Sequence, residues 1–184
     1  MPAKAMTTQQ IALMAVAALL VFWTLGAYNR LMALRNGIGA AFGQLDEALN
    51  QRAGALDRLA AGLPEAQGDA ASALLRVRST QAGLRAAADA LRNRPARAER
   101  ARALAAAEDT LQAELAPLLT GLTQLAEGDS AVALHVAALH EASQRMTFAR
   151  QLFNDAVQQH NAAARQFPTR LIAGLFGFAA AGKL

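Results

Sequence analysis

A short stretch of the sequence, HEASQ, carries residue types that could do metal chemistry. His140 and Glu141 open it, but the helical zinc-protease motif needs a second His four residues after the first, and Gln144 stands there. Zn²⁺ would therefore lack two imidazoles on one helical face, and His135 is five residues back, on another side of the helix. We interpret His140 and Glu141 as an ordinary helix-surface pair.

The remaining histidine, His160, lies seven residues after Phe153 and seven before Phe167, in the apolar phase of its segment. A core histidine satisfied by hydrogen bonds is favoured there over a metal ligand. The sequence also contains no GxSxG, no P-loop and no cysteine. We find no catalytic constellation, expect no cofactor and no metal, and predict that the chain is not an enzyme.

Two asparagine pairs repeat at a seven-residue interval, Asn29 with Asn36 and Asn154 with Asn161. That interval keeps each pair on one face of a helix. Buried amides need mutual hydrogen-bond partners, and such networks fix the register between helices. We therefore predict a helix-registry role for this polar set, with ligand binding as the alternative.

Arginines are concentrated in the middle of the chain, where only Asp89 and Glu99 oppose them. The cluster comprises Arg76, Arg78, Arg85, Arg92, Arg94, Arg97, Arg100 and Arg102. It forms a local basic patch, although the formal net charge of the 184-residue chain is only +4. No aromatic residues are interleaved with it for base stacking, so we expect no nucleic-acid binding and keep that function as the third alternative.

Residues Ile11 to Tyr28 form an uncharged apolar run that is long enough, with its polar flank, to cross a hydrocarbon core of about 30 Å. A cleaved secretory signal is the alternative, but Leu25-Gly26-Ala27 matches the cleavage pattern poorly. We predict that residues 1–28 hold a single-pass transmembrane helix of the cell inner membrane. Arg30 and Arg35 follow it and favour a cytoplasmic domain, with a periplasmic one as the alternative.

The rest of the chain is rich in Ala, Leu, Gln and Arg and poor in β-branched residues, which favours helix almost throughout. In three segments, apolar residues recur at helical intervals. They are Leu31, Leu34, Ile38, Phe42, Leu45, Leu49, Leu56 and Leu59; Leu104, Leu111, Leu115, Leu118, Leu122 and Leu125; and Val132, Val136, Leu139, Met146, Phe153 and Val157. We predict an all-α fold, with the transmembrane helix followed by an antiparallel up-and-down four-helix bundle over residues 29–167.

Proline and glycine mark the expected helix ends. The first helix should continue the membrane span without a break to about Gly62, and the second should begin at Pro64 or Asp69. Pro95 is suited to the first turn of the third helix. Pro117 should kink or break that helix, because it removes one backbone hydrogen bond.

An up-and-down order also decides which connections face the bilayer. The first helix leaves the membrane and the second returns, so residues 93–97 and the apolar tail, residues 168–184, should both face it. Arg92, Arg94 and Arg97 would then form a membrane-facing basic loop. The tail carries residues suited to the membrane interface, with packing over the bundle end as the alternative: Leu171, Ile172, Leu175, Phe176 and Phe178.

Two blocks at opposite ends of the domain resemble signatures of the LemA family. The first consists of Tyr28-Asn29-Arg30-Leu31, Leu34-Arg35-Asn36 and residues 41–46 (AFGQLD). The second consists of residues 149–157 (ARQLFNDAV), Asn161, Phe167-Pro168 and residues 171–178 (LIAGLFGF). The chain departs from the family at Phe42 and His160, where Trp and Tyr are usual.

The resemblance implies a membrane helix followed by a four-helix bundle, with no established enzymatic activity. We interpret the chain as a membrane-anchored interaction or scaffold protein whose partners are the lipid bilayer and another membrane protein, with a homo-oligomer also allowed. Family members resemble proteins that accompany membrane metalloproteases or that form organelle membranes. The alternative function is therefore an accessory factor of a membrane metalloprotease or of a membrane-remodelling system.

Overall fold

The computed structural model describes residues 7–63 and 69–184 of the chain. Its elements are α1 (Thr8–Gly62), α2 (Asp69–Arg92), α3 (Ala98–Ala126), α4 (Ser130–Arg165) and α5 (Thr169–Leu175). The described residues contain helices and no strand. The predicted all-α class is therefore confirmed.

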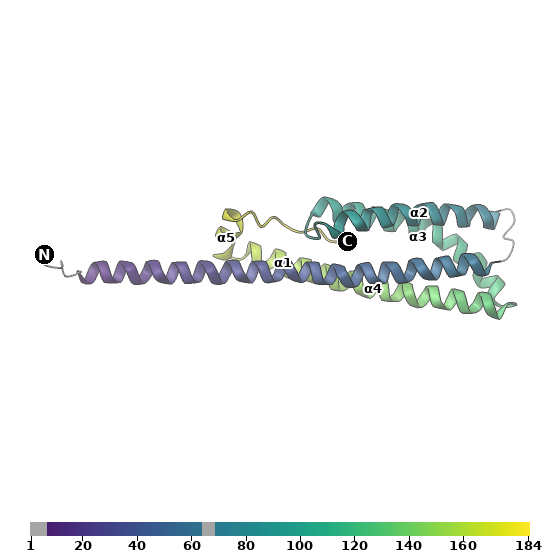
Figure 1. Cartoon of the computed structure of the whole chain (residues 1–184), viewed down its shortest axis with the longest axis horizontal. Coiled ribbons are helices and arrows are strands. Elements are labelled where there is room, and N and C mark those ends of the chain that lie inside the picture. Colours follow the sequence, from purple (N-terminus) through teal and green to yellow (C-terminus); the bar gives the residue numbers. More distant parts are fainter. Residues whose placement is uncertain (1–6, 64–68) are drawn as a thin grey trace.

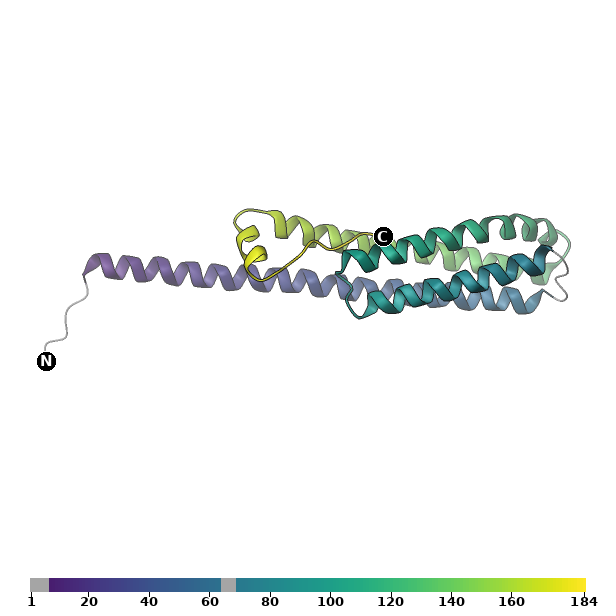
Figure 2. The same cartoon turned by 90° about the horizontal axis from the view of Figure 1, so that it is seen from above.

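Helix α1 is the longest element. It begins with a capping box, in which the side chains of Thr7 and Gln10 each accept a hydrogen bond from the other's backbone N–H. It continues through Tyr28 and Asn29 without a break, as predicted, and ends at Gly62. Its N-terminal part projects alone from the other helices (Figures 1 and 2) and is long and apolar enough to cross a membrane.

The remainder of α1 lies beside α4, and α2 lies beside α3 along the half of the domain remote from the N-terminus (Figures 1 and 2). One apolar core joins these four helices. Buried residues from all of them contribute to it, including Ile38 and Leu45 of α1, Leu84 and Leu91 of α2, Leu104 and Leu111 of α3, and Leu139 and Phe153 of α4.

A second, smaller apolar cluster lies nearer to the N-terminal end, where α4 extends beyond α2 and α3 (Figure 2). It consists of Ala27, Leu31, Ala163, Ile172 and Ala173. Helix α5 thus packs on α1 and α4 where the projecting part of α1 joins the domain.

The predicted apolar faces form this interior. Nearly all residues of the three seams are buried, while Leu34 and Val136 are half-buried. The side chain of Leu125 lies outside the described residues. Local periodicity was sufficient here because the same face of each helix packs inward along all of the helix that lies within the domain.

One prediction about proline is wrong, and a second is wrong in part. Pro95 lies in the turn between α2 and α3 rather than in the helix, which begins at Ala98, because the chain uses these residues to reverse direction. Of the kink or break expected at Pro117, the break does not occur, because α3 continues through this residue. Leu115 and Leu118, buried on either side, hold both flanking turns in the core and offset the lost backbone hydrogen bond.

Candidate functional site

The asparagines of α4 bind the chain that follows α5. Asn161 Nδ2 donates to the Ala181 carbonyl oxygen at 2.9 Å, and the Ala181 N–H donates to Asn161 Oδ1 at 2.8 Å. Asn154 makes the same pair of bonds with Leu184, at 2.9 and 2.8 Å. Each side-chain amide therefore satisfies both backbone groups of one tail residue, in the manner of a neighbouring β-strand.

The spacing of these contacts follows from the rise of the two backbones. Asn154 and Asn161 are seven residues apart on a helix, which corresponds to about 10.5 Å. Ala181 and Leu184 are three residues apart in nonhelical chain, which covers about 10 Å when extended. The seven-residue interval that predicted a helix register therefore matches a short tail segment that runs antiparallel to α4.

The tail also touches the start of α3. A Cβ atom added to Gly182 would lie 2.5 Å from Ala98 Cα and 2.9 Å from the Ala98 carbonyl oxygen. Ala181 is buried, and Leu184 packs against the main core. The last residues of the chain are therefore a structural element that lies between α3 and α4.

The two α1 asparagines of the predicted polar set are placed differently. Asn29 and Asn36 are both exposed, and in the described part of the chain neither is hydrogen-bonded to Asn154 or Asn161. The structure therefore does not bring the four amides of the predicted polar set together. Asn36 instead lines a cleft at the same end of the domain.

This cleft lies between α1, the α2–α3 turn, α4 and the tail, and has a volume of about 680 Å³. Arg35 and Asn36 of α1, Arg94 and Arg97 of the turn, His160 of α4 and Phe178 of the tail are among the residues that line it. No acidic side chain belongs to the described lining. The three arginines give the cleft a positive potential.

The arginines of the predicted basic loop divide into two kinds. Arg92 binds both oxygens of Asp46 on α1, at 2.7 and 2.8 Å, and donates to Asp89 at 2.7 Å. Its hydrogen bond to Asp46 is the main cause that raises the pKa of Arg92, although desolvation opposes it. Arg94 and Arg97 are exposed and form no ion pair with any described residue. Of the three arginines in the predicted basic loop, Arg94 and Arg97 are therefore the ones that the described part of the chain leaves available to an anion.

His160 is the buried polar residue of the cleft. Its side chain is 1% exposed, and Nδ1 lies 3.4 Å from Asn161 Oδ1. Nε2 is buried without a hydrogen-bond partner among the described residues. The prediction of a core histidine is correct for its burial, but among the described residues only one of its two ring nitrogens has a partner.

A buried ion pair that sequence reasoning missed joins α1 to α3. Arg52 Nη1 donates to Glu108 Oε1 at 2.6 Å, Nη2 donates to Oε2, and Gln112 donates to Oε1 at 2.8 Å. Burial alone would raise the pKa of Glu108. The hydrogen bonds and positive charge of Arg52 lower it by more than burial raises it, so the pKa lies below its ordinary value. A groove of about 320 Å³ between α1 and α2 adjoins Arg52. The signal available in the sequence was Arg52 itself, a charge in the middle of an apolar seam.

Helix α5 and its flanks are divided between the domain and the outside. Ile172 is buried, and the Phe178 ring lies 5.8 Å from that of Tyr28, centre to centre. Leu171, Leu175 and Phe176 are each more than half exposed. Of the five residues predicted for the membrane interface, Ile172 and Phe178 thus pack over the domain end instead, and the other three form an exposed apolar face.

The HEASQ stretch lies on α4. His140 is exposed and its Nε2 lies 2.9 Å from Gln144 Nε2 on the next turn. Within the described residues, no three His, Cys, Asp or Glu side chains are close enough to share a metal ion. These side chains therefore occupy the surface position that the sequence predicted.

Comparison with known proteins bears on the whole domain. The LemA family model matches residues 41–183, which include most of α1 beyond the projecting part, all of α2 to α5 and nearly all of the tail. No curated protein and no solved structure matches the chain. The family match covers well over half of the 184 residues and includes both asparagines that bind the tail. The chain belongs to the LemA family.

Proposed function

We propose that the chain is a membrane-anchored scaffold, in which the N-terminal part of α1 spans the inner membrane once and an up-and-down four-helix bundle stands on it. The exposed surface of α1 carries this proposal. Every aliphatic side chain larger than Ala from Ile11 to Leu25 is more than half exposed, on all sides of the helix. A helix that is apolar all round is stable only inside a core or a bilayer, and no described element covers this one.

The position of α5 supports attachment of the domain to the membrane surface beside the end of the span. The Phe176 ring lies 5.1 Å from that of Tyr28, centre to centre, so α5 lies where the apolar part of α1 ends. Tyr28 and Trp23 are residue types that favour the headgroup layer. The exposed face of Leu171, Leu175 and Phe176 would therefore enter the interface beside the span.

A scaffold role without catalysis is supported by how the polar side chains are used. Asn154 and Asn161 bind the tail, and Arg52 and Glu108 bind each other inside the domain. These groups stabilise the fold rather than face a substrate. We propose another membrane protein, or a second copy of the chain, as the partner that the scaffold holds near the bilayer.

The single tryptophan of the chain allows a direct test of attachment. The full chain would be placed in nanodiscs that contain lipids brominated at different depths, which quench nearby indole fluorescence. Trp23 should be quenched most by shallow bromines. A Trp23→Phe/Leu175→Trp variant should show the same depth, because α5 would lie in the interface.

The matched control is Trp23→Phe/Phe148→Trp. Phe148 is exposed on α4 and lies far along the domain from α5, so its indole should not be quenched. Equal quenching at all three positions, or none at any, would contradict the proposed attachment. Quenching of Trp23 without quenching of an indole at position 175 would support the membrane span and contradict the placement of α5 in the interface.

A further inference from the structure

The cleft of about 680 Å³ lined by Arg35, Arg94, Arg97 and His160 combines two features that point to a ligand. It concentrates positive charge with no acidic residue in its described lining, and one of its lining residues, His160, has a buried ring nitrogen, Nε2, that has no hydrogen-bond partner among the described residues. Its volume lies within the usual range for small-molecule sites, roughly 300 to 1,000 Å³. We propose that it binds a phosphate ester that also carries a hydroxyl group.

The arginines define the anionic part of this ligand. Arg35 approaches the cleft from α1, while Arg94 and Arg97 approach from the turn opposite. None of the three has a carboxylate partner among the described residues, in contrast to Arg92. Guanidinium groups from two elements can together bind the several oxygens of one phosphate with charge-assisted hydrogen bonds.

His160 defines the hydroxyl. Asn161 is oriented by its two bonds to Ala181, so its carbonyl oxygen, not its NH₂ group, faces His160 Nδ1. In the neutral imidazole the proton therefore belongs on Nδ1, and Nε2 presents a lone pair. A buried acceptor of this kind needs a donor, which the dianionic phosphate group of a monoester lacks and a hydroxyl group on the same molecule supplies.

Glycerol phosphate is the simplest chemistry that meets both requirements, and it has two sources: a soluble ester or the headgroup of phosphatidylglycerol. Asn36, on the cleft wall, is eight residues beyond Tyr28, or about 12 Å along α1. That distance places the cleft just above the headgroup layer of the proposed attachment. The lipid source rests on the proposed function, whereas binding of the soluble ester does not.

The chain has three histidines, so ¹⁵N-histidine labelling gives a spectrum in which His160 can be followed by itself. The full chain in phosphatidylcholine nanodiscs would be titrated with glycerol 3-phosphate at neutral pH. We expect a saturable shift of the His160 ring nitrogens, with those of His135 and His140 unchanged. Sulfate, an anion without a hydroxyl, should bind at least about tenfold more weakly.

Charge variants test the arginines. Arg94→Gln/Arg97→Gln should weaken glycerol 3-phosphate binding by at least about tenfold, because two charge-assisted contacts are lost. Arg78→Gln/Arg102→Gln removes the same formal charge from exposed positions outside the cleft lining and should leave the affinity within about twofold. All four side chains are exposed, so folding should be unaffected.

Replacing part of the phosphatidylcholine with phosphatidylglycerol separates the two sources. If the headgroup enters the cleft, the His160 shift appears without added ester and soluble glycerol phosphate competes with it. If only the soluble ester binds, His160 stays as in phosphatidylcholine. Either result supports the cleft as a hydroxylated-phosphate site.

The proposal is overturned if His160 does not respond to either source, if sulfate binds as tightly as the ester, or if the two arginine variants weaken binding equally. Trp23 quenching in the same nanodiscs reports membrane attachment separately. A failed cleft with a quenched Trp23 would leave the proposed anchor intact. Ester binding with an unquenched Trp23 would support the cleft and contradict the proposed anchor.

Discussion

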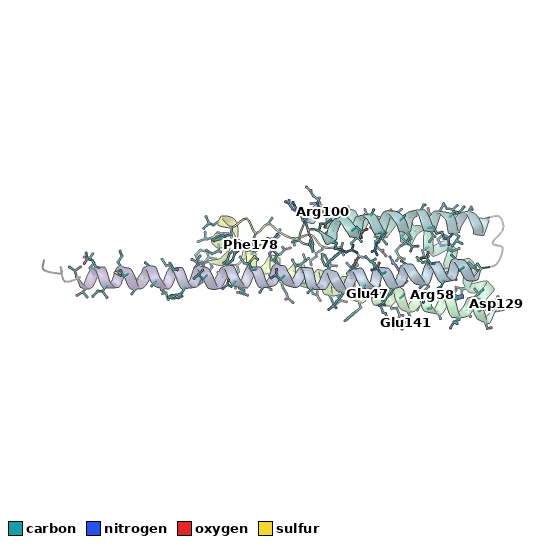
Figure 3. The ribbon with its side chains drawn as sticks, in the orientation of Figure 1. Glu47, Arg58, Arg100, Asp129, Glu141 and Phe178 are labelled. Atoms are coloured by element: carbon teal, nitrogen blue, oxygen red, sulfur yellow. The ribbon has the colours of Figure 1, made fainter. Side chains whose placement is uncertain are left out.

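Arg52 and Glu108 form a bidentate ion pair in the interior, 56 residues apart in the chain and on different helices. Arg52 lies on α1 between Glu47 and Arg58, which are labelled in Figure 3. The side chains of Arg52 and Glu108 are both almost fully buried. Breaking such a pair leaves one charge buried without a partner, while replacing both charges by apolar groups removes the cost of desolvating them. The pair therefore makes a sharp test of how the core is built.

Glu108→Gln should destabilise the domain by about 3 to 5 kcal/mol, because the charge of Arg52 stays buried without its counterion. The double variant Arg52→Met/Glu108→Leu should recover the loss and approach or exceed wild-type stability. Urea denaturation of the detergent-solubilised full chain, followed by far-UV circular dichroism, measures both. Equal destabilisation in the single and double variants would mean that shape, and not charge, decides this site.

The lowered pKa of Glu108 predicts the pH dependence of stability. The unfolded carboxyl has the ordinary pKa of 4.5 and so takes up a proton at higher pH than the folded one. The stabilising contribution is therefore complete above about pH 4.5 and is lost as the pH falls through the lower folded-state value. In denaturation curves recorded between about pH 6 and pH 3, wild type should lose more free energy of unfolding than Arg52→Met/Glu108→Leu. Parallel losses would show that other groups dominate acid unfolding.

Asn154 and Asn161 should hold the tail through their side-chain amides. Replacing either with Leu leaves the backbone groups of one tail residue unpaired and should cost about 1 to 3 kcal/mol. Hydrogen exchange of Ala181 and Leu184, whose N–H groups donate to these amides, should accelerate in the corresponding variants. Asn29→Leu, at an exposed position on α1, serves as the control and should change neither measurement. Unchanged hydrogen exchange at Ala181 in Asn161→Leu would contradict the role of Asn161 in holding the tail.

Gly182 should be intolerant of a side chain. The added methyl group of Gly182→Ala would meet the backbone of Ala98, which cannot rotate away, so the tail must shift and the domain should lose about 1 to 3 kcal/mol. Gly43→Ala is the matched control, because Gly43 lies in mid-helix with open space around it. It should stabilise by about 0.5 to 1 kcal/mol through helix propensity. Thermal denaturation compares the two directly, and a neutral Gly182→Ala would argue against close packing of the tail on α3.

The absence of cysteine makes orientation measurable. A cysteine introduced by Arg58→Cys, at an exposed site on α1, should react with a membrane-impermeant maleimide only after the cells are opened, if the domain is cytoplasmic. Thr8→Cys, at the other end of the apolar run, should react in intact spheroplasts. Labelling of position 58 before lysis would place the domain outside. Arg30→Gln/Arg35→Gln should weaken the preferred orientation, since the positive charge beside the span is reduced.

The helices and their inward faces could be predicted from the sequence because both depend on local information. Helix propensity and the spacing of residues such as Leu45, Leu111 and Phe153 are properties of short segments, and one face packs inward along each helix. The apolar run from Ile11 to Tyr28 could likewise be recognised from the sequence, because its composition and length are local properties. The resemblance to the LemA family then implied the same architecture, a membrane helix followed by a four-helix bundle.

Contacts between distant segments were decided only by the tertiary structure. The seven-residue interval of Asn154 and Asn161 predicts one helix face, but it does not say that an extended tail would meet it. In the same way, the sequence offers several carboxylates as partners for Arg52. Which of them pairs with it depends on how α3 packs against α1. The cleft around His160 is formed by four segments, and no local pattern contains the distances among them. Sequence periodicity specifies directions around one helix axis, whereas pairing across the fold depends on the relative positions of several axes.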